Sequence, residues 1–167
     1  MALVRKVYEA NGPLTDDALG RQIFGDALFA SGAQALADFV AKDGEPAYVY
    51  QFAYVAEPLR ATTPGVGHGG ELPYVFGLRG INPALTSHVT ANDRAVIAQT
   101  QAYWTNFAKT SDPNGAGLPA WPQTSASTPK TLVVSDDGTK AVDGFRKNQL
   151  MLSYAAWSKR TGEKLPN

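Results

Sequence analysis

The residue best placed to do chemistry in this chain is a histidine, His68, in the glycine-rich stretch Gly67-His-Gly-Gly-Glu-Leu-Pro-Tyr-Val75. Imidazole titrates near neutral pH, so it can take a proton from an alcohol and return it to a leaving group. The flanking Gly67 and Gly69 let the backbone approach a substrate closely and leave the ring unobstructed. The stretch therefore favours acid–base catalysis, although on composition alone a loop histidine that only makes a local hydrogen bond is the simpler interpretation.

Glu71 and the second histidine, His88, raise the alternative of a metal site. Zinc sites gather three or four His, Cys or carboxylate ligands, whereas this chain has 2 histidines and no cysteine. We therefore expect no metal ion and no organic cofactor, and we expect His88 to be a surface residue. Tyr74 and Phe76, close to His68 in the sequence, are candidates for lining a pocket.

The stretch Gly65-Val-Gly-His-Gly-Gly70 also fits the dinucleotide-binding pattern G-x-G-x-x-G. That pattern needs an immediate strand-to-helix turn, but a loop with two prolines separates it from the strand-like run that ends at Val55. No second parallel strand follows at the distance of a βαβ unit. The match therefore does not predict nucleotide binding.

A histidine base needs a nucleophile, and the sequence offers no convincing one. Ser31 comes nearest, but it follows a helical pattern instead of a strand. The pattern G-x-S-x-G, which exposes the nucleophile of α/β-hydrolases, surrounds none of the serines. In that fold the serine and an oxyanion loop also lie well upstream of the histidine. The serines are Ser31, Ser87, Ser111, Ser125, Ser127, Ser135, Ser153 and Ser158.

The composition is that of an ordinary globular domain. Hydrophobic residues make up 44% and charged residues 18% of the 167 positions, and 15 basic residues balance 15 acidic ones. The balance gives no indication of binding to nucleic acid or to an anionic membrane. No apolar run approaches the roughly 20 residues of a membrane span, and residues 1–7 are too short and too charged for a signal-peptide core. The absence of cysteine leaves the compartment open.

Periodicity predicts a small set of helices and strands around this loop. Thr15 is expected to cap a helix, Asn92 is expected to cap the best helix, and residues 72–76 form a short helical turn. The expected helices cover 16–25, 29–42, 92–109 and 145–159, and the expected strands cover 47–55, 131–135 and 141–145, the last two joined across Asp136-Asp137-Gly138.

The strand predicted over residues 47–55 is apolar on both faces, with Gln51 as its one polar residue. Such a strand belongs inside a sheet that helices cover on both sides. The chain offers few other strands to surround it, so the predicted sheet is incomplete. At strand and helix spacing the large aromatic residues are expected to form core; these are Tyr48, Tyr50, Phe52, Tyr54, Trp104 and Phe107.

Taken together, these residues resemble the C-terminal third of the type-B carboxylesterases, which include cholinesterases and bacterial para-nitrobenzyl esterases. The similarity runs in the same order from about Tyr8 to about Arg146. The segments that carry it are Asp26…Phe29, Tyr48-Val-Tyr-Gln-Phe-Ala-Tyr54, Gly67-His-Gly-Gly-Glu-Leu-Pro-Tyr-Val-Phe-Gly77, Trp104-Thr-Asn-Phe-Ala-Lys-Thr-Ser-Asp-Pro-Asn-Gly115 and Trp121-Pro122.

The resemblance implies an α/β fold, namely the C-terminal part of an α/β-hydrolase domain over residues 1–167, with an incomplete sheet flanked by helices. It also implies a Ser–Glu/Asp–His triad that works through an acyl-enzyme on a small-molecule ester. His68 matches the triad histidine. Glu71 matches an acidic position that we expect to have a supporting role, because the family places its triad acid upstream.

The segments that carry the nucleophile, the oxyanion loop and the triad acid in this family have no counterpart here. We therefore expect the chain to be inactive alone and to need the missing N-terminal esterase portion, in cis or as a second chain, with no nucleic acid partner and no membrane span. Two alternatives stay open. One is a non-catalytic interaction module, because adhesion proteins without a working triad share the fold. The other is a small autonomous hydrolase that uses one of the serines.

Overall fold

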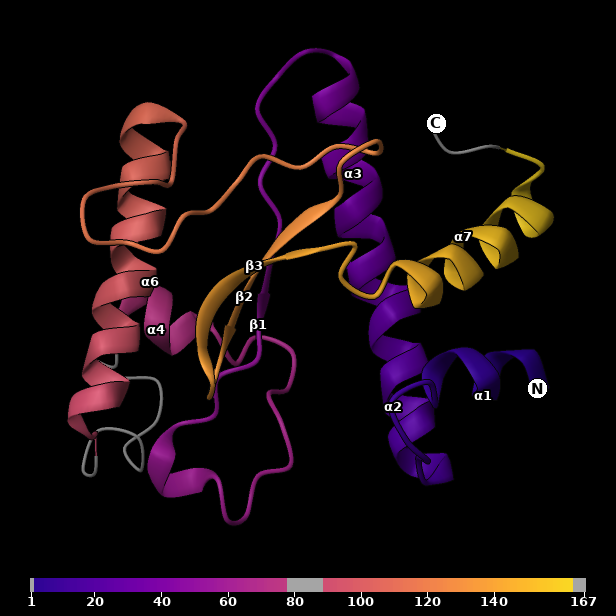
Figure 1. Ribbon diagram of the computed structural model, residues 1–167, viewed down its shortest axis with the longest axis horizontal. Coiled ribbons are helices and arrows are strands. Elements are labelled where there is room, and N and C mark those ends of the chain that lie inside the picture. Colours follow the sequence, from indigo (N-terminus) through magenta and orange to yellow (C-terminus); the bar gives the residue numbers. More distant parts are fainter. Residues whose placement is uncertain (1, 78–88, 164–167) are drawn as a thin grey trace. The chain divides into compact units, whose positions relative to one another are not determined.

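The computed structural model describes residues 2–77 and 89–163 (Figure 1). The chain divides into two compact units. The first comprises the described residues of Met1–Val49, Gln123–Lys130 and Asp143–Asn167, and the second those of Tyr50–Pro122 and Thr131–Val142. The helices are α1 (Ala2–Tyr8), α2 (Asp16–Gly25), α3 (Ser31–Lys42), α4 (Leu72–Phe76), α6 (Ala91–Thr110) and α7 (Lys147–Thr161), with a π-helix η1 (Asp26–Ala30) and a 3-10 helix η2 (Glu57–Leu59).

The first unit contains a helix that runs without a break through α2, η1 and α3. Thr15 caps it as predicted, because its side chain accepts a hydrogen bond from the amide of Ala18 at 3.2 Å. The prediction of two separate helices, 16–25 and 29–42, is wrong. A π-turn joins them, in which the Ser31 amide donates to the Asp26 carbonyl. α1 covers residues for which the sequence predicted no element.

Because of this continuity, the helix Asp16–Lys42 is 27 residues long, with a mean hydropathy of 1.2 over its most apolar stretch. In the described part of the chain it is the one helix that is long and apolar enough to cross a membrane, by length and composition alone. This is a weak indication, because core helices of soluble proteins meet the same criterion. The expected absence of a membrane span therefore stays a prediction.

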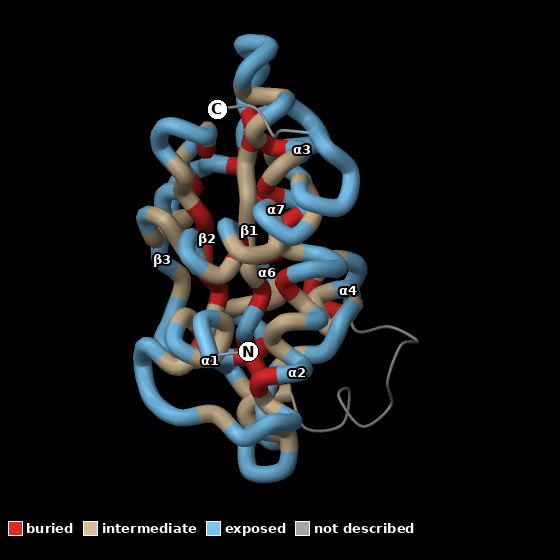
Figure 2. Tube along the Cα trace, turned by 90° about the vertical axis from the view of Figure 1, so that its right-hand side faces the viewer, coloured by how far each residue is buried: buried red, intermediate tan, exposed pale blue. Residues whose placement is uncertain are grey.

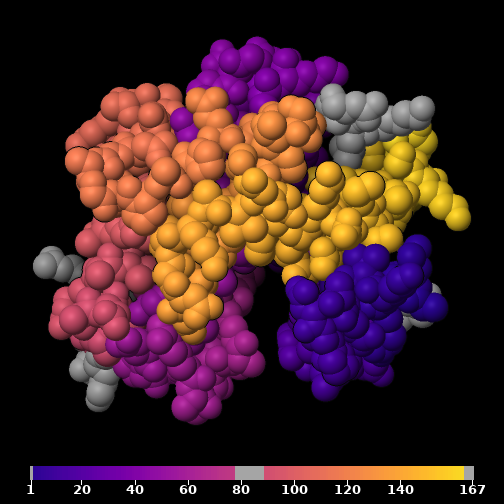
Figure 3. All heavy atoms as spheres, viewed as in Figure 1, coloured from indigo at the N-terminus to yellow at the C-terminus, as the bar shows by residue number. Residues whose placement is uncertain are grey.

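The strands belong mostly to the second unit. Among the described residues, β1 (Tyr50–Phe52), β2 (Lys130–Ser135) and β3 (Gly138–Asp143) form one sheet in the order β1-β2-β3. β1 pairs with β2 in parallel, with Gln51 opposite Val133. β2 is buried along most of its length, whereas β3 is largely exposed, as the burial colours of Figure 2 show. Figure 3, coloured by sequence, shows atoms in the colour of β3 at the surface of the face that it draws. The predicted hairpin is confirmed, with its second strand at 138–143 instead of 141–145.

The strand predicted over 47–55 is regular only at Tyr50–Phe52. The Ala53 amide still donates to the Val134 carbonyl at 2.7 Å, but the next amide toward β2, that of Val55, donates to the Asp136 side chain at 2.9 Å. A side chain thus ends the ladder on one edge. On the other edge, the described residues supply no partner strand for β1.

The aromatic side chains of β1 meet those of other elements of the second unit, as predicted for one face of a strand. Tyr50 contacts Trp121 edge-on with ring centroids 5.5 Å apart, and Phe52 lies 4.8 Å from Tyr74. The core prediction is wrong for Trp104 and Phe107, which are 44% and 47% exposed. The described residues cover that part of α6 only partly, with the Tyr50 ring edge-on to Trp104 at 6.2 Å between centroids.

The predicted helix 92–109 is confirmed as α6, but its expected cap, Asn92, is wrong. Thr90 caps it in a reciprocal capping box, because its hydroxyl accepts from the Asp93 amide and its own amide donates to the Asp93 carboxylate. The pattern T-x-x-D that produces this box is present in the sequence. The predicted helix 145–159 is α7, displaced by two residues at each end.

Candidate functional site

His68 occupies a tight turn in the second unit. The Gly70 amide donates to the Gly67 carbonyl at 3.0 Å, and His68 is the exposed second residue of this turn. Gly69 follows with a φ of +76°, which is the backbone conformation that a type II turn requires at its third position. The turn therefore requires a glycine at position 69, and it leaves His68 at the surface.

Gly70 is needed for a different reason. A Cβ placed on this residue would lie 3.0 Å from the Gly67 carbonyl oxygen and would also collide with the Val66 side chain. A side chain on residue 70 would therefore strain the turn. This close approach fixes the path of the backbone on both sides of His68.

The turn leads directly into α4, so the histidine and the helix share one continuous set of hydrogen bonds. The Leu72 amide donates to the Gly69 carbonyl at 3.1 Å, and the Val75 amide donates to the Glu71 carbonyl at 3.0 Å. Glu71 occupies the N-cap position of α4. The short helical turn predicted at 72–76 is confirmed, and Glu71 stands between it and the histidine turn.

Glu71 acts electrostatically on β1. Burial first, and the Glu71 carboxylate second, raise the pKa of Tyr50 to about 12. Burial also raises the pKa of Tyr74 to about 12, and nearby Asp93 adds to the effect. Both phenols therefore stay neutral at physiological pH, and neither supplies a phenolate base beside His68.

The two residues expected to line a pocket lie in contrasting environments. Tyr74 is buried, and its ring packs edge-on against Tyr54 at 5.8 Å between centroids. Phe76 is 73% exposed. Their role beside His68 stays a prediction, because no groove described in the second unit includes them.

A groove of about 720 Å³ is present in the first unit instead, between α1, the long helix and α7. Its lining is mainly apolar and includes Ala27, Phe39 and Trp157. Ser31 also lines it, but the Ser31 hydroxyl lies within a helix and donates to the Ala27 carbonyl at 3.3 Å. This serine therefore has neither the strand-to-helix turn nor the exposure of a hydrolase nucleophile.

The structure does not describe two residues considered from the sequence, the serine Ser87 and the second histidine His88, which lie outside the described residues. Among residues 2–77 and 89–163, no group of three or more His, Asp or Glu side chains is arranged to hold a metal ion.

One cluster near the site was missed from the sequence. Asp93, at the start of α6, is 3% exposed and accepts hydrogen bonds from the Tyr54 hydroxyl and from the Glu57 amide. These partners lie 39 and 36 residues away along the chain. The capping motif could have identified Asp93 as a helix cap, but no local pattern indicates its contacts with residues beyond β1.

Comparison with known proteins identifies the family to which this chain is similar. The Carboxylesterase family matches residues 9–153. The chain is 35% identical over 126 residues to carboxylesterase 5A of Canis lupus familiaris, which covers 72% of this chain and 22% of that protein. It is also 36% identical over 95 residues to neuroligin-3 of Mus musculus, covering 55% of this chain and 12% of that protein.

A solved structure supports the same relationship at the level of the fold. The carboxylesterase EST55 of Geobacillus stearothermophilus at pH 6.2 superposes with a TM-score of 0.69 and 27% identity, covering 88% of this chain and 31% of that one. This chain covers less than a quarter of the length of the two curated relatives named above, carboxylesterase 5A and neuroligin-3. With its small parallel-containing sheet and flanking helices, it has a partial α/β-hydrolase fold and belongs to the carboxylesterase family.

Proposed function

We propose that this chain is the part of a serine carboxylesterase that supplies the catalytic histidine, His68, to a nucleophile carried by another part of the fold. The observation that carries the proposal is the Gly67–Gly70 turn, which presents an exposed imidazole immediately before α4. Family membership supports the reaction class.

In this role His68 moves protons between oxygens. It accepts the proton of the serine hydroxyl as that oxygen attacks the ester carbonyl, and it donates the proton to the departing alcohol. In the second half of the reaction it accepts a proton from water, which attacks the acyl-enzyme, and returns it to the serine oxygen. Glu71 supports the turn from the N-cap of α4, and Gly67 and Gly69 keep the surroundings of the ring open.

The chain alone is proposed to be inactive, because within the described residues no serine occupies a strand-to-helix turn. One edge of β1 has no partner strand among residues 2–77 and 89–163, and this edge supports a missing neighbour. Gln51 and Ala53 direct their main-chain groups toward β2, so those of Tyr50 and Phe52 point to the other edge. There the Gln51 side-chain amide donates to the Phe52 carbonyl at 3.2 Å, in the position where a further strand would donate.

A chimaeric enzyme tests this function. Residues 2–163 replace the matching region of the Geobacillus stearothermophilus carboxylesterase, and hydrolysis of a chromogenic short-chain ester is measured. His68→Ala is expected to lower kcat by about 10³-fold or more, whereas His88→Ala, at the only other histidine, is the matched control and leaves kcat unchanged. A well-folded chimaera whose activity is the same with and without His68 would remove the histidine from catalysis.

The same unpaired edge favours a second candidate, a non-catalytic interaction module, because exposed strand edges recruit partner strands. This candidate predicts a stable complex with a partner and no hydrolysis in the chimaera. A chain that stays a monodisperse monomer and exposes no apolar patch would argue against it.

A further inference from the structure

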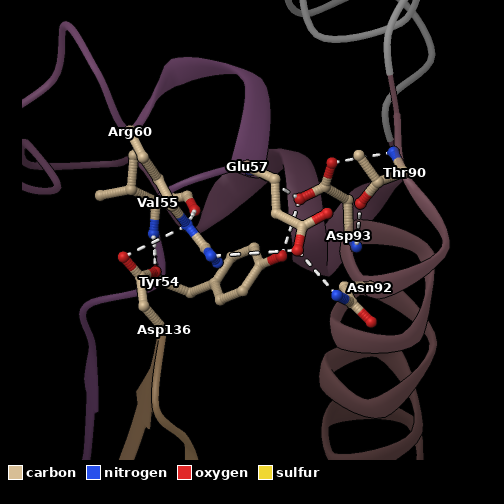
Figure 4. Close-up of polar contacts among 8 residues, drawn as sticks. All are labelled: Tyr54, Val55, Glu57, Arg60, Thr90, Asn92, Asp93 and Asp136. Carbon is tan, nitrogen blue, oxygen red and sulfur yellow. Dashed lines mark hydrogen bonds and ion pairs between the residues drawn. The ribbon is translucent and has the colours of Figure 1, made fainter.

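The Asp93 carboxylate makes more contacts than a helix cap needs. Its Oδ2 accepts from the Thr90 amide at 2.9 Å, which completes the capping box. Its Oδ1 accepts from the Tyr54 hydroxyl at 2.7 Å and from the Glu57 amide at 3.1 Å (Figure 4). A surface carboxylate would cap the helix equally well, but this one is 3% exposed, so a second role accounts for its burial.

Both Oδ1 partners lie on the segment that leads from β1 to His68. Tyr54 follows β1, and Glu57 begins η2. The start of α6 therefore holds the upstream end of the chain segment that carries the histidine turn. Asn92, also in the first turn of α6, adds to this attachment by donating to the Glu57 carboxylate at 2.7 Å.

The downstream end of the same segment is held by the same helix, because α4, which begins four residues after His68, packs on α6. The two ends also contact each other, because the ring of Tyr74 in α4 packs against the ring of Tyr54. Residues 57–72 thus form a loop with both ends attached to α6, and His68 lies within it.

Arg60 fixes the upstream end to the sheet as well. Its Nε donates to the Val55 carbonyl at 3.0 Å and lies 3.3 Å from Asp136, in the turn between β2 and β3. Its guanidinium also lies over the Tyr54 ring at 5.2 Å (Figure 4). Tyr54 is therefore clamped between α6 and the sheet, and its hydroxyl has little freedom to leave Asp93.

Burial alone would raise the pKa of Asp93, but the hydrogen bonds from Thr90, Tyr54 and Glu57 outweigh it and keep the pKa below that of an ordinary aspartate. The group is thus a carboxylate at neutral pH, and both donors meet a full negative charge. Charge-assisted hydrogen bonds are shorter and stronger than neutral ones.

We propose that Asp93 is a positioning residue for His68, which it holds in place through Tyr54 and Glu57 by attaching the histidine-bearing loop to α6. The proposal rests on the catalytic role of His68 proposed above. Asp93 itself touches no reacting atom. Asp93 determines the position of the His68 imidazole, and a displacement of about 1 Å in a catalytic group can lower the reaction rate by about 10²-fold.

The decisive variant is Tyr54→Phe, which removes one hydroxyl and keeps the buried ring. Its matched control is Thr139→Val. The Thr139 hydroxyl also donates to α6, to the Gln99 side chain at 2.5 Å, but it belongs to β3, outside the loop of residues 57–72. Asp93→Asn is the stronger change, and Tyr54→Phe still decides if that variant does not fold.

In the chimaeric esterase, Tyr54→Phe is expected to lower kcat about tenfold with KM within about twofold, while Thr139→Val changes neither. In the isolated full chain, Tyr54→Phe is expected to shift the ring nitrogen resonances of His68 and to speed amide exchange across residues 57–71. Equal effects of the two variants, or none from either, would overturn the positioning role. If His68→Ala leaves hydrolysis intact, the proposed catalytic function fails, and the His68 resonances and the exchange rates still decide whether Asp93 positions the loop.

Discussion

The ion pair between Asp26 and Arg146 offers the strongest quantitative test of the first unit. The Asp26 carboxylate is 4% exposed and accepts from Arg146 Nε at 2.8 Å, from Arg146 Nη2 at 2.5 Å and from the Tyr8 hydroxyl at 2.8 Å. It joins η1 to the start of α7 and to α1. Asp26→Asn removes the charge, keeps the shape, and leaves the guanidinium with neutral acceptors only, the new amide oxygen and that of Gln22.

The expected loss follows from how far each group can reach water. Removing one partner of a fully buried pair costs about 3–5 kcal/mol. The Arg146 side chain retains 24% exposure and also donates to Gln22 at 3.2 Å, so part of its charge stays solvated. We therefore expect Asp26→Asn to lower the free energy of unfolding by about 2–3 kcal/mol, just under the range for a fully buried pair.

Urea denaturation followed by circular dichroism measures this loss. The control is Asp17→Asn on the same long helix. The Asp17 side chain is 74% exposed, and that of its ion-pair partner, Arg21, is 62% exposed. Exposed pairs are worth about 0–1 kcal/mol, so the control is expected to stay close to wild type. Equal losses for the two variants would refute the reasoning. If Asp26→Asn does not fold, Arg146→Lys, which keeps the charge and loses the two-pronged contact, decides by the same comparison.

Three further predictions concern the second unit. Thr100→Val is expected to stabilise the chain by about 1 kcal/mol, measured in urea, because the buried Thr100 hydroxyl has no hydrogen-bond partner among the described residues and the replacement has the same shape. Gly70→Ala is expected to lower the thermal midpoint, because its Cβ would lie 3.0 Å from the Gly67 carbonyl oxygen, and an unchanged midpoint would mean that the turn is looser than it appears. Since the pKa of Asp93 is lowered in the folded chain, its contribution to stability is complete above the ordinary aspartate pKa of about 3.9 and is lost as the pH falls through the lower folded value. Asp93→Asn should therefore flatten the acid side of a stability–pH curve, and curves that stay parallel below pH 4 would contradict this.

Local sequence signals predicted those elements whose causes are local. The Thr15 cap, the Asp136-Asp137-Gly138 hairpin and the helical turn at 72–76 each depend on a few neighbouring residues, and all three are confirmed. The sequence predicts a break between 25 and 29 because Gly25 and Gly32 interrupt the helical pattern, and a glycine weakens a helix by about 1 kcal/mol. It does not occur, because a π-turn there directs Asp26 to partners at Tyr8 and Arg146, contacts that the sequence cannot reveal.

The candidate site likewise has features with a local cause, which the sequence indicates, and features with a long-range cause, which it does not. The glycines around His68 are readable because a positive φ and a close backbone approach need glycine. The residues that hold this turn in space are not readable, since Tyr54 and Asp93 are 39 residues apart and each looks unremarkable in its own segment. The sequence therefore shows that glycines matter around His68, whereas the turn they form and its position, set by the long-range contacts of α6, come from the structure.

The incomplete sheet and the exposed apolar side chains have one explanation in common. A strand with Phe52 and Tyr54 buried reads as central, yet β1 has one neighbour among the described residues, and Trp104 and Phe107 on α6 remain about half exposed. Apolar surface left in water on a domain with its own core normally marks an interface. The matched relatives are several times longer than this chain, so the proposed N-terminal esterase portion is the partner that would cover these side chains. N-methylation of the Phe52 amide blocks the β1 edge and keeps the buried ring of Phe52, so it should abolish assembly with that portion. The same change at Ala53 would instead break the bond from its amide to the Val134 carbonyl, within the chain's own ladder to β2.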